Sequence, residues 1–340
     1  MASNNFLNAC KREQVETTPV WLMRQAGRSL PSYRALRERH SFMQVATTPE
    51  LAAEVTLMPL DVLDVDAAII FADIMTPLTS AGVLFEIKEG VGPVIESPIR
   101  ESKDLDHLRV PAVDEVAAAT IEAIRIVRKQ LGGITPLIGF AGAPFTLASY
   151  LIEGKPNRDF TRTKSLMYSQ PQVWAELMQR LTEMTINYLT AQVEAGAQAI
   201  QLFDSWVGAL GPQDYATSVQ PYVDSIFEGT RSLGVPRIHF GTGNPALLEL
   251  MSSTGAEVMG IDFRIDLSEA WRRVGSAKAV QGNLDPAVLL GSPELVKERT
   301  QRVLQQAAGR PGHIFNLGHG VLPQTPLDNI KLLVDTVHSA

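Results

Sequence analysis

The sequence predicts an α/β protein, a (β/α)8 TIM barrel that forms a single domain. Three observations lead to this prediction. The chain has 340 residues, a length that suits one large α/β domain. Eight short apolar runs rich in β-branched residues recur along it, and amphipathic helical stretches lie between them. A strand followed by a helix, eight times over, is the signature of this barrel.

The eight predicted strands are residues 20–23, 67–71, 137–140, 197–203, 237–240, 258–262, 279–283 and 314–317. Predicted helices cover residues 49–63, 115–130, 171–194, 212–233, 293–308 and 327–337, and several begin with proline, which suits the first helical turn.

One stretch departs from this alternation. Residues 84–89 and 93–99 flank Gly90 and Gly92, a pattern that predicts a β-hairpin inserted after the second strand. No composition shift, low-complexity tract or fixed-period repeat divides the chain, so we expect one domain over residues 1–340.

The bulk composition limits the partners. The formal net charge is −7, which argues against nucleic acid as a partner. Cys10 is the only cysteine, so an intrachain disulfide or a multi-thiolate zinc site is excluded and a reducing compartment is indicated. The N-terminal residues lack a long apolar segment and no apolar run reaches about 18 residues, so we expect a cytoplasmic protein without membrane association.

Arg24 and Arg28 are four residues apart in a locally basic segment of an acidic chain. Guanidinium groups bind carboxylates through two parallel hydrogen bonds, so several at one mouth favour a polycarboxylate ligand. The alternative is a solvated basic face. The apolar residues Trp21, Leu22 and Met23 favour the ligand interpretation, because a buried strand would deliver the arginines into a site.

Asp73 follows the apolar run 69–72, where desolvation disfavours its charged form. A turn or helix N-cap role is an equally good interpretation. In a site for polycarboxylates Asp73 must face donors or a developing cation, because like charges about 4 Å apart repel by roughly 4 kcal/mol at an effective dielectric of 20.

His319 lies between Gly318 and Gly320 at a predicted strand end, where small neighbours allow a ligand to approach, although a lone histidine is often structural. Tyr150 and Ser205 offer hydroxyl donors, and each taken singly also suits a packing role. The histidines form no zinc-binding pair, so we predict no metal. Nucleotide-binding loops and a nucleophile elbow are also missing.

Five motifs carry a resemblance to a known family: PVWLMRQAGRSLPSYR, IIFADI, GFAGAPFTLASYLIEG, LFDSWVGALGP and NLGHGVLPQTP. In this order and spacing they resemble uroporphyrinogen decarboxylase, from about Thr18 to the C-terminus. The resemblance implies a homodimeric barrel enzyme without a cofactor. It would remove carbon dioxide from the four acetate side chains of uroporphyrinogen III in tetrapyrrole (heme and chlorophyll) biosynthesis, giving coproporphyrinogen III.

The resemblance also implies roles for individual residues. Asp73 would stabilise the transition state, Arg24 would position the reacting acetate or a donor water, and Tyr150 or His319 would be other proton routes. Ser29 stands where the family more often has tyrosine. The implied substrate-binding residues are Arg24, Gln25, Ala26, Gly27, Arg28, Asp73, Tyr150, Ser205 and His319.

Two other functions compete with this one. A corrinoid-linked methyltransferase resembles this chain distantly, but its relatives activate a thiol on zinc bound by His and Cys, and Cys10 lies before the first strand. A carrier that binds a tetrapyrrole without chemistry is the third hypothesis. Turnover, zinc content and the effect of Asp73→Asn distinguish the three.

Overall fold

The computed structural model describes residues 4–27, 29–88, 91–157 and 159–340. Its centre is a curled sheet of seven parallel strands in the order β1-β4-β5-β6-β7-β8-β9. The strands are β1 (Ala68–Ile69), β4 (Leu137–Gly142), β5 (Ala199–Asp204), β6 (Arg237–Gly241), β7 (Val258–Gly260), β8 (Ala279–Gln281) and β9 (His313–Ile314).

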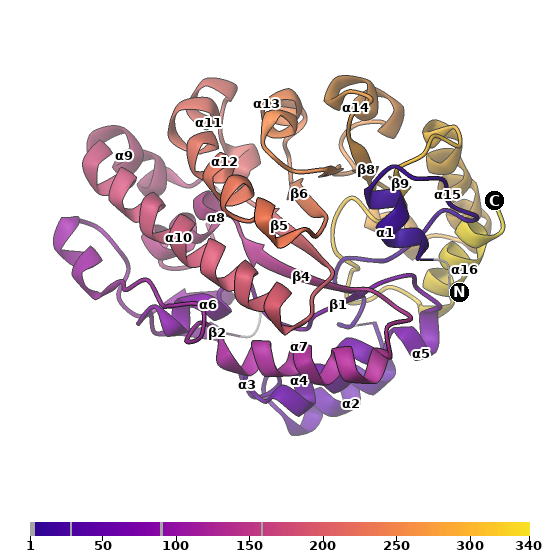
Figure 1. The fold of residues 1–340 in the computed structure, drawn as a ribbon, viewed down its shortest axis with the longest axis horizontal. Helices are drawn as coiled ribbons and strands as arrows, with labels where there is room; N and C mark the ends of the chain where they lie inside the picture. Colours follow the sequence, from indigo (N-terminus) through magenta and orange to yellow (C-terminus); the bar gives the residue numbers. More distant parts are fainter. Residues whose placement is uncertain (1–3, 28, 89–90, 158) are drawn as a thin grey trace.

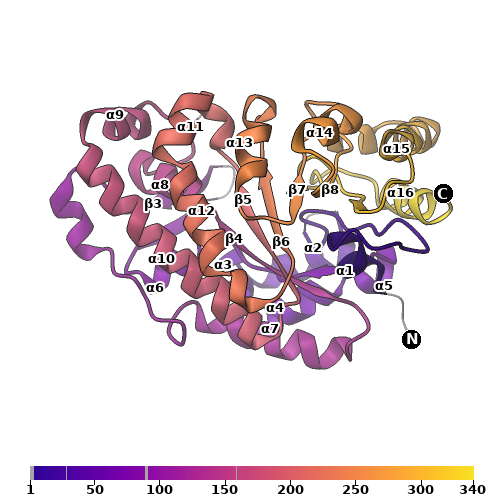
Figure 2. The ribbon, with the colours of Figure 1, turned by 45° about the horizontal axis from the view of Figure 1, so that its top comes forward.

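Helices lie along the outside of this sheet, and helices α1 (Asn5–Cys10) and α16 (Leu327–His338) lie on the same side of the molecule (Figures 1 and 2). The α-helices are α1 (Asn5–Cys10), α2 (Pro31–Arg39), α3 (Phe42–Thr47), α4 (Pro49–Leu57), α5 (Leu60–Leu63), α6 (Thr76–Ser80), α7 (Ala118–Leu131), α8 (Pro144–Glu153), α9 (Thr161–Ser169), α10 (Pro171–Ala195), α11 (Pro212–Ser218), α12 (Gln220–Gly229), α13 (Leu248–Ser253), α14 (Leu267–Val274), α15 (Pro293–Ala307) and α16 (Leu327–His338). Short 3-10 turns are η1 (Ser102–His107), η2 (Val207–Ala209), η3 (Arg231–Leu233), η4 (Pro245–Leu247) and η5 (Pro286–Leu290).

Proline explains why two long helices that the sequence predicts as continuous are each divided in the structure. The predicted helix 49–63 ends its first part at Leu57 and resumes at Leu60, with Pro59 between them. The predicted helix 212–233 ends at Ser218 and restarts at Gln220, with proline as the next residue. Proline lacks the backbone N–H that an interior helical position needs, so each helix stops before it.

The first predicted strand, residues 20–23, is wrong as a strand, because only Val20 forms a single parallel bridge, to Phe315. The backbone N–H groups of the next residues are bound by side chains instead of by a ladder. Leu22 donates to Gln25 Oε1 at 3.0 Å, and Met23 donates to Asn316 Oδ1 at 3.1 Å. These side-chain acceptors turn the chain away from the sheet after one bridge.

The segment around Val20 nevertheless connects the two edges of the sheet. Trp21 N donates to Phe315 O at 3.3 Å on the β9 side. Asp66, which directly precedes the β1 segment, donates its N–H to Val20 O at 2.8 Å. The next residues of the chain are thereby fixed between the first and last strands.

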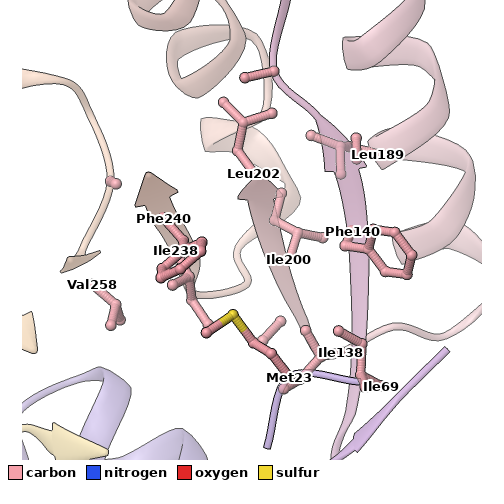
Figure 3. Packing of buried hydrophobic residues seen from close by; sticks show 14 of the residues in the cluster. Met23, Ile69, Ile138, Phe140, Leu189, Ile200, Leu202, Ile238, Phe240 and Val258 are labelled. Atoms are coloured by element: carbon pink, nitrogen blue, oxygen red, sulfur yellow. The ribbon is translucent and has the colours of Figure 1, made fainter. Parts of the chain in front are cut away.

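The sheet encloses a packed core of branched and aromatic side chains. Figure 3 shows Met23 beside Ile69, Ile138 and Ile238, and each of these side chains is at most 8% exposed.

A chain of polar contacts crosses the same interior. Trp21 Nε1 donates to Gln281 Oε1 at 3.0 Å, and Gln281 Nε2 donates to Gln201 Oε1 at 3.0 Å. Buried amides that satisfy one another in this way cost little stability.

Outside the sheet, β2 (Phe85–Lys88) and β3 (Gly92–Ile95) pair antiparallel after α6. Residues 89 and 90, where the sequence places the turn of its predicted hairpin, lie outside the described residues. Among the helices that are described, none has the length and apolar character needed to cross a membrane.

Candidate active site

Arg24 lies in a tight loop directly after the bridge at Val20, and its side chain is exposed. Its φ angle is 65°, in the left-handed region that costs a non-glycine residue roughly 1–2 kcal/mol. A hydrogen bond from Gly27 N to Arg24 O at 3.0 Å closes the turn. Strained backbone of this kind is typical of functional sites. Arg28, the second predicted arginine, lies outside the described residues.

Gln25 and Ala26 hold this loop on the scaffold. Gln25 is 1% exposed, its Oε1 accepts the Leu22 N–H, and its Nε2 donates to Ala67 O at 2.9 Å. Both ends of the amide are therefore occupied by backbone. Ala26 packs in a small apolar cluster with side chains from α2, α3 and α4, while Gly27 is half-buried. The Gln25 side chain thus fixes the turn that presents Arg24.

Asp73, after β1, takes the turn role that the sequence leaves open, and its role toward a ligand stays a prediction. Its Oδ1 accepts the Met75 N–H at 2.9 Å, and its own N–H donates to Thr76 Oγ1 at 3.2 Å. Burial raises the pKa of the Asp73 carboxyl, and the Met75 N–H and the charge of Arg24 oppose that rise. Asp73 therefore caps a turn through one oxygen and interacts electrostatically with the predicted arginine.

Tyr150, on α8, belongs to the same group. Burial is the main cause that raises its pKa to about 12, and the Asp73 carboxylate adds to it, while a hydrogen bond with the Trp206 side chain and the charge of Arg24 lower it. The Tyr150 and Trp206 rings meet with centroids 5.8 Å apart. The phenol thus stays protonated at neutral pH and is available as a hydrogen-bond donor.

His319 lies between two glycines that allow close packing on both sides. A Cβ on Gly318 would lie 2.2 Å from Phe263 N, and one on Gly320 would lie 2.6 Å from Arg24 Cδ. Burial lowers the pKa of His319, and the charges of Arg24 and Arg264 lower it further. Its Nδ1 accepts the Gly320 N–H at 2.8 Å. The neutral ring therefore presents Nε2–H as a donor.

Ser205 is half-buried at the end of β5, and its carbonyl accepts a hydrogen bond from Thr242 Oγ1. It stands between Asp204 and Trp206, so the chain itself brings it beside the partner of Tyr150.

Asp204 is a buried carboxyl behind this group. It is 0% exposed, and Thr146 Oγ1 donates to its Oδ1 at 3.0 Å. Trp206 N donates in turn to Thr146 Oγ1 at 3.3 Å. Burial raises the pKa of Asp204 to about 7, although the Thr146 hydroxyl opposes the rise. Asp204 and Thr146 therefore fix the turn that carries Ser205 and Trp206.

Arg264 is the residue of this region that the sequence reasoning missed. It follows β7, its side chain is 49% exposed, and its Nη1 donates to Asp262 Oδ2 at 2.6 Å. Asp262 is the last residue of the predicted strand 258–262, but nothing in the sequence shows that the arginine two residues later lies near His319. Only the packing of Gly318 on Phe263 brings them together.

Four of the predicted residues, Arg24, Asp73, Tyr150 and His319, are thus joined by electrostatic interactions or by direct packing. Among the described residues, no three His, Cys, Asp or Glu side chains are grouped so as to hold a metal ion. A separate cavity of about 470 Å³ lies elsewhere, lined in part by Arg100, Arg162 and Ile152.

The chain is similar to a known family over its whole length. The family model described as "Uroporphyrinogen decarboxylase (URO-D)" matches residues 1–340. A uroporphyrinogen decarboxylase of Streptomyces avermitilis is 55% identical over 98% of this chain and 94% of its own length. One from Roseiflexus sp. is 52% identical and covers 99% of each chain.

A solved structure with the same fold is more distant. A methyltransferase from Methanosarcina mazei superposes with a TM-score of 0.82 over 100% of this chain and 99% of its own, at 21% identity. At that identity the likeness shows the fold alone. The family match and the relatives above 50% identity are decisive: the chain belongs to the uroporphyrinogen decarboxylase family.

Proposed function

We propose that this protein is a carboxy-lyase that decarboxylates the four acetate side chains of uroporphyrinogen III, giving coproporphyrinogen III and four molecules of carbon dioxide. The relatives named uroporphyrinogen decarboxylase support this function. The observation that carries it within the chain is the grouping of Arg24, Tyr150 and His319 with one acidic side chain, Asp73.

The chemistry of the substrate fits this grouping. Uroporphyrinogen carries eight carboxylates and a ring of four pyrrole N–H donors. Arg24 and Arg28 would bind carboxylates through paired hydrogen bonds, and the neutral His319 and Tyr150 would donate further ones. Asp73 would accept hydrogen bonds from the pyrrole N–H groups, because a carboxylate cannot face the substrate's own carboxylates without repulsion.

The reaction needs no electron sink beyond the pyrrole. A proton adds to the ring carbon next to the one that bears the acetate, and the ring becomes a cation. The acetate C–C bond then breaks, carbon dioxide leaves, and its electron pair neutralises the ring. Proton addition at the new exocyclic carbon and proton loss from the ring give a methyl group. Asp73 would stabilise the cation more than the neutral ring, and this difference accelerates the reaction.

The roles of the other predicted residues follow from their positions. Arg24 would orient the reacting acetate or a donor water, because a guanidinium is a poor acid. Gln25, Ala26 and Gly27 would form the turn that carries the arginines. Ser205 would contribute a hydroxyl from the turn that Asp204 and Thr146 fix.

We further propose a single (β/α)8 domain over residues 1–340, in which the segment at Val20 closes the barrel. Its hydrogen bonds toward both edges of the sheet support this closure. The pair β2–β3 would be a hairpin inserted into the barrel. From the family resemblance we propose a homodimer that uses no cofactor. The single cysteine, Cys10, supports a place in the cytoplasm.

The test is anaerobic incubation of purified protein with uroporphyrinogen III, with the products resolved by their number of carboxylates. We expect seven-, six- and five-carboxylate intermediates and then the four-carboxylate product. Folded protein that binds the substrate without forming products would establish the carrier hypothesis instead. Stoichiometric zinc by metal analysis would favour the methyltransferase hypothesis, although the thiol of Cys10 is buried in α1.

A further inference from the structure

We propose that Arg264 is a further substrate-binding residue, which together with Arg24 holds a carboxylate of the substrate next to His319. This inference rests on the proposed location of the substrate at Arg24, Asp73, Tyr150 and His319. It adds a residue from the segment after β7, whose neighbour Phe263 contacts the loop that carries His319.

The packing of two glycines places His319 between the two arginines. Gly318 lies so close to the backbone of Phe263 that no Cβ would fit, and a Cβ on Gly320 would lie 2.6 Å from the side chain of Arg24. The loop that carries His319 is therefore pressed against both the Arg24 turn and the segment after β7. His319 experiences the positive charges of Arg24 and Arg264 together.

Asp262 fixes the guanidinium of Arg264 in this position. Asp262 is 0% exposed, its Oδ1 accepts the Arg264 N–H at 2.8 Å, and its Oδ2 accepts Arg264 Nη1 at 2.6 Å. The Gly243 N–H also donates to Oδ2, at 2.5 Å. The guanidinium carbon lies 4.4 Å from the centroid of the Phe263 ring. A carboxylate anchor and an aromatic face together restrict the side chain to one orientation.

Most of the hydrogen-bonding capacity of Arg264 remains available. A guanidinium has five N–H donors, and within the described residues Arg264 uses one of them, toward Asp262. Its side chain is 49% exposed, so the remaining donors are accessible to solvent. Asp262 occupies only one of these side-chain donors, so Arg264 combines a positive charge with unused N–H groups close to the neutral ring of His319. That combination suits an additional anionic group.

A carboxylate side chain of the substrate is the ligand that this arrangement fits. Paired hydrogen bonds from a restrained guanidinium recognise a carboxylate with little further loss of side-chain entropy. The Nε2–H of His319 supplies a neutral donor on the same side. The same groups would exclude a tetrapyrrole whose corresponding side chain is uncharged, because they would be left without an acceptor.

The experiment compares wild type, Arg264→Gln, Arg264→Lys and Asp73→Asn in the anaerobic turnover assay. For Arg264→Gln we expect KM to rise about tenfold, equal to about 1.4 kcal/mol, with kcat changed less than about twofold. Arg264→Lys keeps the positive charge but loses the paired N–H donors of the guanidinium, so its KM should lie between those of wild type and Arg264→Gln. Arg272→Gln, at an exposed arginine of α14 paired with Glu269, is the matched control and should keep the wild-type KM.

A second readout separates binding from a structural role. If Arg264 attracts the substrate, KM of the wild type should rise with ionic strength more steeply than KM of Arg264→Gln. A structural role would instead lower kcat and the midpoint of urea unfolding together, with parallel salt curves. That pattern, or a KM of Arg264→Gln within twofold of wild type, would overturn the inference. If Asp73→Asn also kept full activity, the proposed site itself would be wrong.

Discussion

Asp204 should make the stability of this protein depend on pH in a way that Asp204→Asn removes. The carboxyl is 0% exposed, and burial raises its pKa from the usual 3.8 to about 7. Between these two values the folded chain holds a proton that the unfolded chain has released. Stability is therefore highest below about pH 4 for this group and falls as pH rises toward 7, where the folded carboxyl also ionises.

The size of this effect follows from the pKa difference. The contribution of Asp204 to the free energy of unfolding falls by 1.36 kcal/mol for each pH unit between the two pKa values. From pH 5 to about pH 7 this is roughly two units, so the free energy of unfolding falls by about 2 to 3 kcal/mol between pH 5 and pH 8. The asparagine side chain keeps an oxygen that can accept the hydrogen bond from Thr146, and its NH2 group takes the place of the O–H of the protonated carboxyl. Asp204→Asn should therefore fold but lack this fall in stability.

The assay is urea unfolding of both proteins at pH 5 and pH 8, followed by circular dichroism. From pH 5 to pH 8 the free energy of unfolding of wild type should fall by about 2 to 3 kcal/mol more than that of Asp204→Asn. Asp61→Asn, at an exposed position of α5, controls for the loss of one negative charge. Parallel pH dependence in wild type and Asp204→Asn would show that Asp204 does not bind its proton more tightly in the folded state.

Two further predictions concern packing. Gly318→Ala would place a Cβ 2.2 Å from Phe263 N, so the loop must move, and we expect turnover to fall on the order of 10²-fold. Gly211→Ala is the control and should keep wild-type turnover, because no atom lies within 4 Å of the added Cβ. Equal rates in the two alanine variants would contradict the tight fit. Arg237→Ala should lower the free energy of unfolding by about 3 kcal/mol, because this 5% exposed arginine binds a carboxylate and backbone carbonyls. Arg272→Ala is its exposed control, and an unfolding midpoint equal to that control would count against a stabilising role of the buried arginine.

The fold could be predicted largely because the strands of a parallel sheet are apolar on both faces. β4 and β5 are buried along nearly their whole length, and their continuous apolar runs stand out in the sequence. The first predicted strand failed for a reason that lies far away in the chain. Asn316 supplies the acceptor that takes the Met23 N–H away from a ladder, and no local pattern shows that contact.

The candidate site was predicted in part. Strand ends marked Asp73 and His319, because catalytic groups of barrels gather there. The left-handed backbone of Arg24 was invisible, since arginine gives no sign of a positive φ. Arg264 was missed because its position depends on a glycine contact between two loops that are distant in the sequence.

The most direct test of the proposed mechanism is single-turnover decarboxylation by Asp73→Asn, measured anaerobically at saturating uroporphyrinogen together with the substrate dissociation constant. If Asp73 stabilises the cationic ring, the rate should fall by about a hundredfold or more while the dissociation constant changes less than about tenfold. A wild-type rate in the folded variant, or a loss confined to binding, would contradict the central role of this carboxylate.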